Sequence, residues 1–184
     1  MKHALALGLV ASVFAAGCAQ QSAQIRPEPT YKQAAEAPML QSSRDAVQRL
    51  LAGLDIAATG PGPVLVATVV NVNDLNRAAP LGRTLSEQYA NAMAMSGFDV
   101  KEIKLRGAVF VKQDAGELLL SREIKDIARQ HNASMVVVGT YSAAANFTYV
   151  SLKLVRMEDS RIIRGYDYAL PVDRDVKQLL VQAR

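Results

Sequence analysis

Residues 63–70 read PVLVATVV, an apolar run rich in β-branched side chains. A continuous run of this kind is typical of an interior strand that is covered on both faces. The sequence TGPGP at residues 59–63 favours a turn immediately before it. The stretch therefore predicts a buried strand at the centre of a sheet.

A helix and a second strand are predicted next along the chain. The sequence PLGRTLSEQYANAMAMSG at residues 80–97 begins with Pro80, which suits a first helical turn, and ends with Gly97, which suits a helix stop. Its apolar stripe at helical spacing consists of Leu81, Leu85, Tyr89, Ala92 and Met93. FDVKEIKL at 98–105 alternates as a half-exposed strand does. The order strand, helix, strand predicts a βαβ unit.

The remaining segments predict further helices and strands around this unit. SSRDAVQRLLAGL at 42–54 reads as an amphipathic helix, with Ser42 and Asp45 at capping-box spacing. A short strand or hairpin arm at 108–112 and a helix at 121–132, capped by Ser121, precede a second buried strand at 134–141. FTYVSLKLVRM and RIIRGYDYAL, joined by EDS, predict an antiparallel hairpin, and a helix is expected over 173–183. The fold class is therefore α/β: one mixed β-sheet with helices packed on it.

The amino terminus has the layout of an export signal. In MKHALALGLVASVFAAGC, a positive start precedes an apolar run that is too short to span a bilayer. Ala15-Ala16-Gly17-Cys18 resembles the bacterial lipobox, and Cys18 is the only cysteine of the chain. The resemblance implies a lipoprotein signal peptide at 1–17 and a Cys18 that carries lipid; the alternative is an incidental cysteine in an apolar segment.

A flexible tether is expected between the lipid and the folded domain. Residues 18–41 contain Pro27, Pro29 and Pro38 and show no apolar period. Ala19 stands where an aspartate would resemble the inner-membrane retention signal, so we expect the outer membrane, with the domain on its periplasmic face. Two or more acyl chains hold a protein stably on a bilayer. The α/β domain is then expected over residues 42–184.

Composition and motifs point away from nucleic acid and from catalysis. Without residues 1–17 the chain has 20 Lys and Arg against 17 Asp and Glu, a net charge of +3 with the signs interspersed, which is no basic stripe. The sequence contains no nucleophile elbow, Walker loop, dinucleotide-binding glycine turn or zinc-binding H-E-x-x-H helix. Ser121 and Lys125 could suggest a serine–lysine pair, but we interpret them as a helix cap and an exposed lysine. We interpret His131, the one histidine beyond the signal segment, as a solvated residue at a helix end. We expect no enzyme, cofactor or metal; the oligomeric state stays open.

Two polar clusters are candidates for binding a partner. Asn71, Asn73, Asp74, Asn76 and Arg77 follow the first buried strand, at the edge where open α/β sheets bind ligands. The alternative is that these residues only shape a turn. The second cluster joins Tyr149, Ser151 and Lys153 on one hairpin strand with Tyr166 and Tyr168 on the other. Tyrosines on an exposed sheet can form a contact surface, or they can lie under the last helix.

Several ordered segments resemble the FlgO-type domain of flagellar outer-membrane lipoproteins. They are residues 66–106, GELLLSRE at 116–123, VVVGTYS at 136–142, YVSLKLVRMEDSRII at 149–163 and DYALP at 167–171. The resemblance implies an α/β domain similar to the amino-terminal domain of TolB, without catalytic residues. It also implies outer-membrane attachment and a supporting role around the flagellar basal body, for motility. The alternative function is a periplasmic lipoprotein regulator of a cell-wall synthase, because domains of this fold also occur in such proteins.

Overall fold

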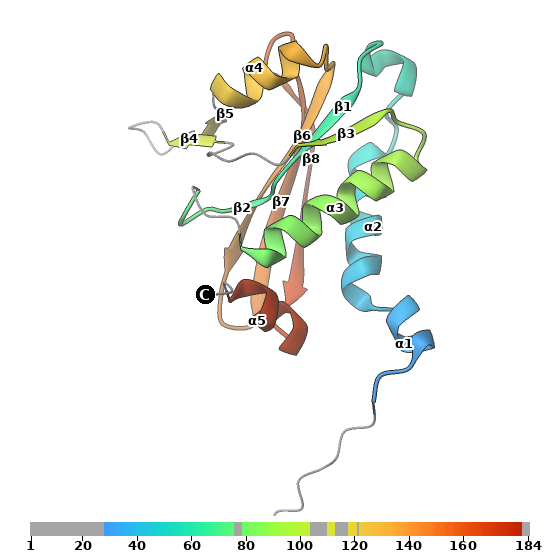
Figure 1. Cartoon of the computed structure of the whole chain (residues 1–184), viewed down its shortest axis with the longest axis vertical. Helices are drawn as coiled ribbons and strands as arrows, with labels where there is room; N and C mark the ends of the chain where they lie inside the picture. Colours follow the sequence, from blue (N-terminus) through green and yellow to red (C-terminus); the bar gives the residue numbers. More distant parts are fainter. Residues whose placement is uncertain (1–27, 76–78, 104–109, 113–117, 121, 182–184) are drawn as a thin grey trace, which may run out of the picture.

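The computed structural model describes residues 28–75, 79–103, 110–112, 118–120 and 122–181. Within them, six strands form a mixed sheet in the order β3-β1-β6-β7-β8, with β2 also paired to β6 (Figure 1). The strands are β1 (Val64–Ala67), β2 (Val70–Asn71), β3 (Val100–Ile103), β6 (Met135–Ala143), β7 (Phe147–Arg156) and β8 (Ile162–Pro171). The parallel part holds β1, β2, β3 and β6, whereas β7 and β8 are antiparallel to their neighbours. The predicted fold class is confirmed.

The βαβ unit has the predicted elements. β1 and β3 pair in parallel, with Val64 opposite Val100, and α3 (Pro80–Met95) connects them. Pro80 occupies the first helical turn, and Gly97 follows the helix with a φ of 91°. A positive φ costs glycine little, so Gly97 ends the helix without strain. All five residues of the predicted stripe of α3 are buried.

The strand predicted over residues 63–70 is interrupted in the structure. β1 ends at Ala67 and β2 begins at Val70. At the break the buried Val69 N–H donates to Ser86 Oγ of α3 at 2.8 Å, and Ser86 Oγ donates to the Gly82 carbonyl at 2.7 Å. Ser86 therefore replaces the ladder partner that Val69 lacks, which is how a buried backbone amide can leave the sheet.

The first long helix begins earlier than the sequence predicts. α2 spans Pro38–Leu51, so the expected start at Ser42 with a capping box to Asp45 is wrong. Before it, α1 (Tyr31–Ala35) has a capping box between Thr30 and Gln33. Residues 31–41 were expected to be part of the tether, but they include α1 and the first residues of α2. The half-buried Met39 packs against the core. Residues 1–27, with Cys18, lie outside the described residues.

Helices cover the two faces of the sheet unequally. α2, α3 and α5 (Arg174–Leu180) pack on one face, where the larger core includes Leu50, Leu85, Tyr89, Leu152 and Val176. α4 (Arg122–Gln130) packs on the other face, against a smaller core that includes Leu65, Val136 and Val138. Figure 1 shows α4 at one end of the sheet and α5 at the opposite end. The smaller core leaves much of its face without a helix among the described residues.

Three short elements complete the described part of the chain. β4 (Phe110–Lys112) and β5 (Leu118–Leu120) pair antiparallel in a separate two-stranded sheet, consistent with the short strand expected at 108–112. A 3₁₀ helix, η1, covers Ile56–Thr59 before the turn that leads into β1. No helix among the described residues has the length and apolar character needed to cross a bilayer.

Candidate partner-binding surface

The polar segment that follows β2 forms a tight turn. Asn71 Oδ1 accepts a hydrogen bond from the Asn73 N–H at 2.9 Å, and the Asp74 N–H donates to the Asn71 carbonyl at 3.1 Å. The Asn71 side chain also hydrogen-bonds Tyr141; burial raises the pKa of Tyr141, and this hydrogen bond opposes the rise. Asn71 is thus engaged in shaping the turn. Asn76 and Arg77 lie outside the described residues.

The cluster expected on the β7–β8 hairpin is divided between the two faces of the sheet. The register sets Ser151 opposite Asp167 and Leu152 opposite Tyr166. Side chains that face each other across an antiparallel pair share a face, and successive side chains along a strand alternate. The row of Tyr149, Ser151 and Lys153 therefore shares its face with Asp167. Tyr166 and Tyr168 lie on the opposite face, so the five residues do not form one surface.

Tyr168 belongs to a buried hydrogen-bond network beneath the helices. Its hydroxyl bonds the hydroxyl of Tyr89 on α3 and that of Ser43 on α2. Ser43 Oγ in turn donates to Gln88 Oε1 at 2.6 Å. Burial raises the pKa of Tyr168 and raises that of Tyr89 well above its ordinary value. The network ties α2 and α3 to β8, which is a packing role.

Tyr166 also lies on the helix-covered face of the sheet, where it contacts α2. The guanidinium carbon of Arg49 on α2 lies 5.9 Å from the centroid of the Tyr166 ring, which is within cation–π range. The rings of Tyr166 and Tyr168 stack with centroids 6.3 Å apart. This tyrosine pair contacts α2 and α3, whereas the alternative interpretation placed the tyrosines under the last helix.

A groove of about 570 Å³ lies on the face that α4 only partly covers. We call it the open-face groove; it is lined by Val72, Thr140, Ser142, Tyr149, Val150, Ser151, Asp167, Tyr168 and Ala169, of which Val150 and Tyr168 direct their side chains to the opposite face of the sheet. Tyr149 is 56% exposed, and Phe147, 45% exposed, has its ring centroid 6.4 Å from that of Tyr149. Exposed aromatic rings beside hydrogen-bonding groups are characteristic of protein contact surfaces. Tyr149 is thus at the groove, and Lys153 is half-buried farther along the same face.

Part of this groove is not predicted from the sequence, although β6 contains a signal for it. From Met135 to Gly139 every residue is buried, and beyond them Thr140 and Ser142 are partly exposed while Tyr141 between them is buried. The change from a continuous apolar run to alternation marks the position at which one face loses its cover. Asp167 and Ala169 have no comparable signal, because their strand alternates throughout.

A second cavity, of about 810 Å³, lies near the end of α4 and the turn between β7 and β8. The charged side chains that line it are Lys125, Arg129, Arg156 and Glu158. Arg129 pairs with Asp126 at 2.9 Å, and the two nitrogens of Arg156 contact both carboxylate oxygens of Asp159 at 3.0 and 2.8 Å. The hydrogen bond from Arg156 lowers the pKa of Asp159. Two of the three cations are thus neutralised by neighbouring carboxylates.

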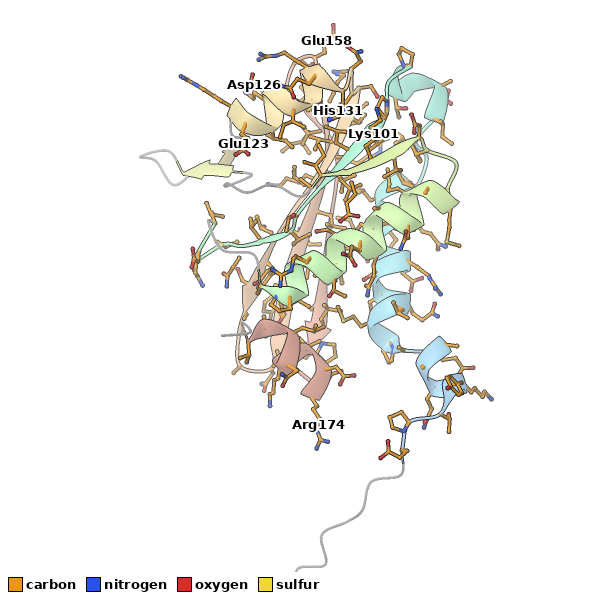
Figure 2. All side chains as sticks on the ribbon, viewed as in Figure 1. Lys101, Glu123, Asp126, His131, Glu158 and Arg174 are labelled. Atoms are coloured by element: carbon orange, nitrogen blue, oxygen red, sulfur yellow. The ribbon has the colours of Figure 1, made fainter. Side chains whose placement is uncertain are left out.

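Of the residues that the sequence suggested for catalysis, the structure describes Lys125 and His131. Figure 2 shows His131 at the α4 end of the domain. His131 is exposed, directly after α4, and Ser121 lies outside the described residues. In the described ranges there is no group of three or more His, Cys, Asp or Glu side chains with the spacing of a metal site.

Solved structures that resemble this chain are bacterial proteins of low sequence identity. The LpoB C-terminal domain from Salmonella enterica is 20% identical, with a TM-score of 0.46 over 70% of this chain and 94% of that one. The NMR structure of Escherichia coli LpoB is 19% identical, with a TM-score of 0.45 over 92% and 86%. The PelC dodecamer from Paraburkholderia phytofirmans is 14% identical, with a TM-score of 0.42 over 60% of this chain and 71% of that one. No curated protein matches the sequence.

The family comparison covers nearly all of the described sheet and its helices. The match to the FlgO protein family runs over residues 44–175, from the first turns of α2 to the start of α5. It therefore includes the β7–β8 hairpin and the open-face groove. Because the match spans well over half of the sequence, this chain belongs to the FlgO protein family.

Proposed function

We propose that this FlgO family protein is an outer-membrane lipoprotein that acts as a non-catalytic interaction module and supports the flagellar basal body and motility. Family membership over residues 44–175 is the observation that carries the proposal. The lipobox-like segment before Cys18 supports the membrane attachment. In this proposal the acylated Cys18 holds the domain on the periplasmic face of the outer membrane, with basal-body or other envelope proteins as partners.

The open-face groove supports a binding role for the domain. Apolar residues that remain exposed next to hydrogen-bonding groups gain free energy when a partner covers them, because apolar surface leaves water while the polar groups keep partners. Tyr149 and Val72, which is 40% exposed, provide such apolar surface on the groove. Asp167 and Ser151 provide the polar groups. Interfaces of this type depend on a few aromatic and charged contacts rather than on area alone.

Deletion of the gene in a flagellated host tests the proposed function. We expect reduced swimming in soft agar and fewer retained filaments by electron microscopy, both restored by the wild-type gene. The Cys18→Ser gene is the matched control for the anchor, and it should fail to restore swimming although its domain folds. Unchanged swimming after deletion would refute the proposal. Altered peptidoglycan synthesis with intact flagella would instead favour the cell-wall synthase regulator.

A further inference from the structure

β8 is the last strand of the sheet, and its outer edge has no neighbouring strand among the described residues. The Val172 N–H donates to the Asn146 carbonyl at 2.9 Å, just beyond the paired residues of β7 and β8. Hydrogen-bonded and non-hydrogen-bonded pairs alternate along an antiparallel ladder. Gly165, Asp167 and Ala169 therefore direct their N–H and C=O groups away from β7, toward the outer edge.

This edge is accessible and has little side-chain bulk. Gly165, Asp167 and Ala169 are all exposed. A Cβ added at Gly165 would meet only the Leu152 carbonyl oxygen at 3.6 Å, which is an ordinary contact, so the fold itself does not require glycine there. Glycine inside a strand costs stability and often marks a place where another backbone approaches closely. The outer edge of β8 has the properties of a site for an added strand.

The side chains beside the edge define the chemistry of the added strand. Asp167 takes part in none of the ion pairs found among the described residues. It lines the open-face groove, between Gly165 and Ala169 in the sequence of the strand. A residue opposite Asp167 on an added strand would share its face, where a basic side chain is favoured. Bulky apolar side chains opposite Gly165 and Ala169 would find space there, and the one opposite Ala169 would share its face of the sheet with the exposed ring of Tyr149.

We propose that the outer edge of β8 and the open-face groove together bind an extended segment of a partner protein as an additional strand. On the open face, alternate residues of that segment are bulky apolar, basic and bulky apolar, opposite Ala169, Asp167 and Gly165. Backbone hydrogen bonds to the edge supply affinity, and the alternate side chains supply specificity. The inference rests on the proposed function, because it specifies how the interaction module binds its partner.

Peptide binding to the full-length lipoprotein in detergent tests the inference. The probe is a blocked, fluorescently labelled peptide with the central sequence leucine, threonine, lysine, threonine, leucine, and the matched probe has glutamate in place of lysine. By fluorescence anisotropy we expect the lysine peptide to bind at least tenfold more tightly than the glutamate peptide. The Asp167→Lys variant should reverse this preference. Equal binding of both peptides, or a preference that Asp167→Lys leaves unchanged, would overturn the inference.

A backbone variant tests the strand pairing separately from the charge. Ala169→Pro removes an outward N–H that no strand of the described sheet uses, whereas Ala169→Val keeps that N–H and adds side-chain bulk. Circular dichroism checks that both variants are folded. Ala169→Pro should weaken the lysine peptide at least tenfold, and Ala169→Val less than threefold. If Ala169→Pro leaves the peptide affinity unchanged, addition of a partner strand is refuted. It is also refuted if neither peptide binds and the protein is a dimer that Ala169→Pro dissociates.

Motility separates failure of this inference from failure of the proposed function. If deletion impairs swimming, Ala169→Pro should not restore it and Ala169→Val should. Full restoration by Ala169→Pro would refute the inference and leave the flagellar role intact. Normal swimming of the deletion strain would refute the flagellar role, whereas the peptide measurements would still decide the strand addition.

Discussion

Replacing Gly82 of α3 by alanine should destabilise the protein, although glycine is normally a poor residue within a helix. Replacing an exposed glycine in a helix interior by alanine normally raises the free energy of unfolding by about 1 kcal/mol. At Gly82, however, an added Cβ would lie 2.0 Å from the Val69 carbonyl oxygen, at the break between β1 and β2. Real Cβ atoms essentially never approach closer than 3.0 Å, so α3 would have to move by at least 1 Å.

The cost of that movement follows from the contacts it disturbs. Forcing an extra carbon into a packed site costs about 1–3 kcal/mol. Moving α3 away from the strand also stretches the 2.8 Å hydrogen bond between the Val69 N–H and Ser86 Oγ. A buried amide left without its partner costs about 1–3 kcal/mol. After subtraction of the helix-propensity gain of about 1 kcal/mol, the net loss is about 1–5 kcal/mol, or a large part of the stability of a typical domain.

Urea denaturation of the purified protein, followed by circular dichroism, measures this loss. For a net loss of about 3 kcal/mol, the thermal midpoint should also fall by about 6–12 °C. Gly165→Ala is the matched control, because its Cβ makes only an ordinary 3.6 Å contact. Removing a strand glycine there should raise stability by about 0.5–1 kcal/mol. If Gly82→Ala were as stable as the wild type, the close approach of α3 to the strand break would be refuted.

Three further predictions address burial, pH and the membrane anchor. Thr148 Oγ1 is buried without a hydrogen-bond partner in the described structure, so Thr148→Val should raise the free energy of unfolding by about 1 kcal/mol, whereas Thr59→Val, which loses a 2.7 Å bond to a backbone carbonyl, should lower it by about as much. Burial raises the pKa of Tyr89 above its ordinary 10.0, so the stability that the neutral phenol contributes is complete below pH 10 and is lost as the pH rises above 10. Tyr89→Phe should therefore flatten the alkaline part of a curve of unfolding free energy against pH. An unchanged slope would contradict this prediction. Cys18→Ser should move the protein from the membrane to the soluble fraction, and mass spectrometry of the wild type should find lipid on Cys18; an unmodified sulfur there would refute the anchor.

The βαβ unit could be predicted from the sequence because its signals are local. Pro80 and Gly97 fix the two ends of α3 through their own backbone preferences, and the apolar stripe between them has helical spacing. The strands at 134–141 and 147–157 were predicted from apolar runs and alternation in the same way, and β6 and β7 cover most of these residues. Each of these features depends on residues that are neighbours in the chain.

Features that depend on distant residues could not be predicted. The break between β1 and β2 is possible because Ser86, seventeen positions after Val69, accepts its N–H. The predicted cap at Ser42 is wrong because α2 already begins at Pro38, so Ser42 lies inside the helix. Next to it, the buried Ser43 hydroxyl bonds Gln88, 45 positions later, a tertiary contact that the local sequence does not reveal.

The division of the hairpin cluster follows from a register that the sequence does not specify. Ser160, in the turn between β7 and β8, has a φ of 59°, and the register shifts between Leu154 and Val155. A bulge adds one residue to one strand, and a shift of one residue moves every side chain to the other face. Simple alternation on each strand is therefore compatible with Tyr149 and Tyr166 on the same face or on opposite faces. The structure places them on opposite faces.

Because the two faces of β8 differ, stability and binding should respond to different residues of the same strand. Tyr168 is held in the network with Tyr89 and Ser43, so Tyr168→Phe should lower the free energy of unfolding by about 1 kcal/mol and leave peptide affinity unchanged. Asp167, one residue earlier, is exposed on the open-face groove, so Asp167→Lys should change peptide preference with little effect on stability. Binding loss in Tyr168→Phe equal to that in Asp167→Lys would mean that β8 acts only through the integrity of the fold. In that case, the open face would not be the binding surface.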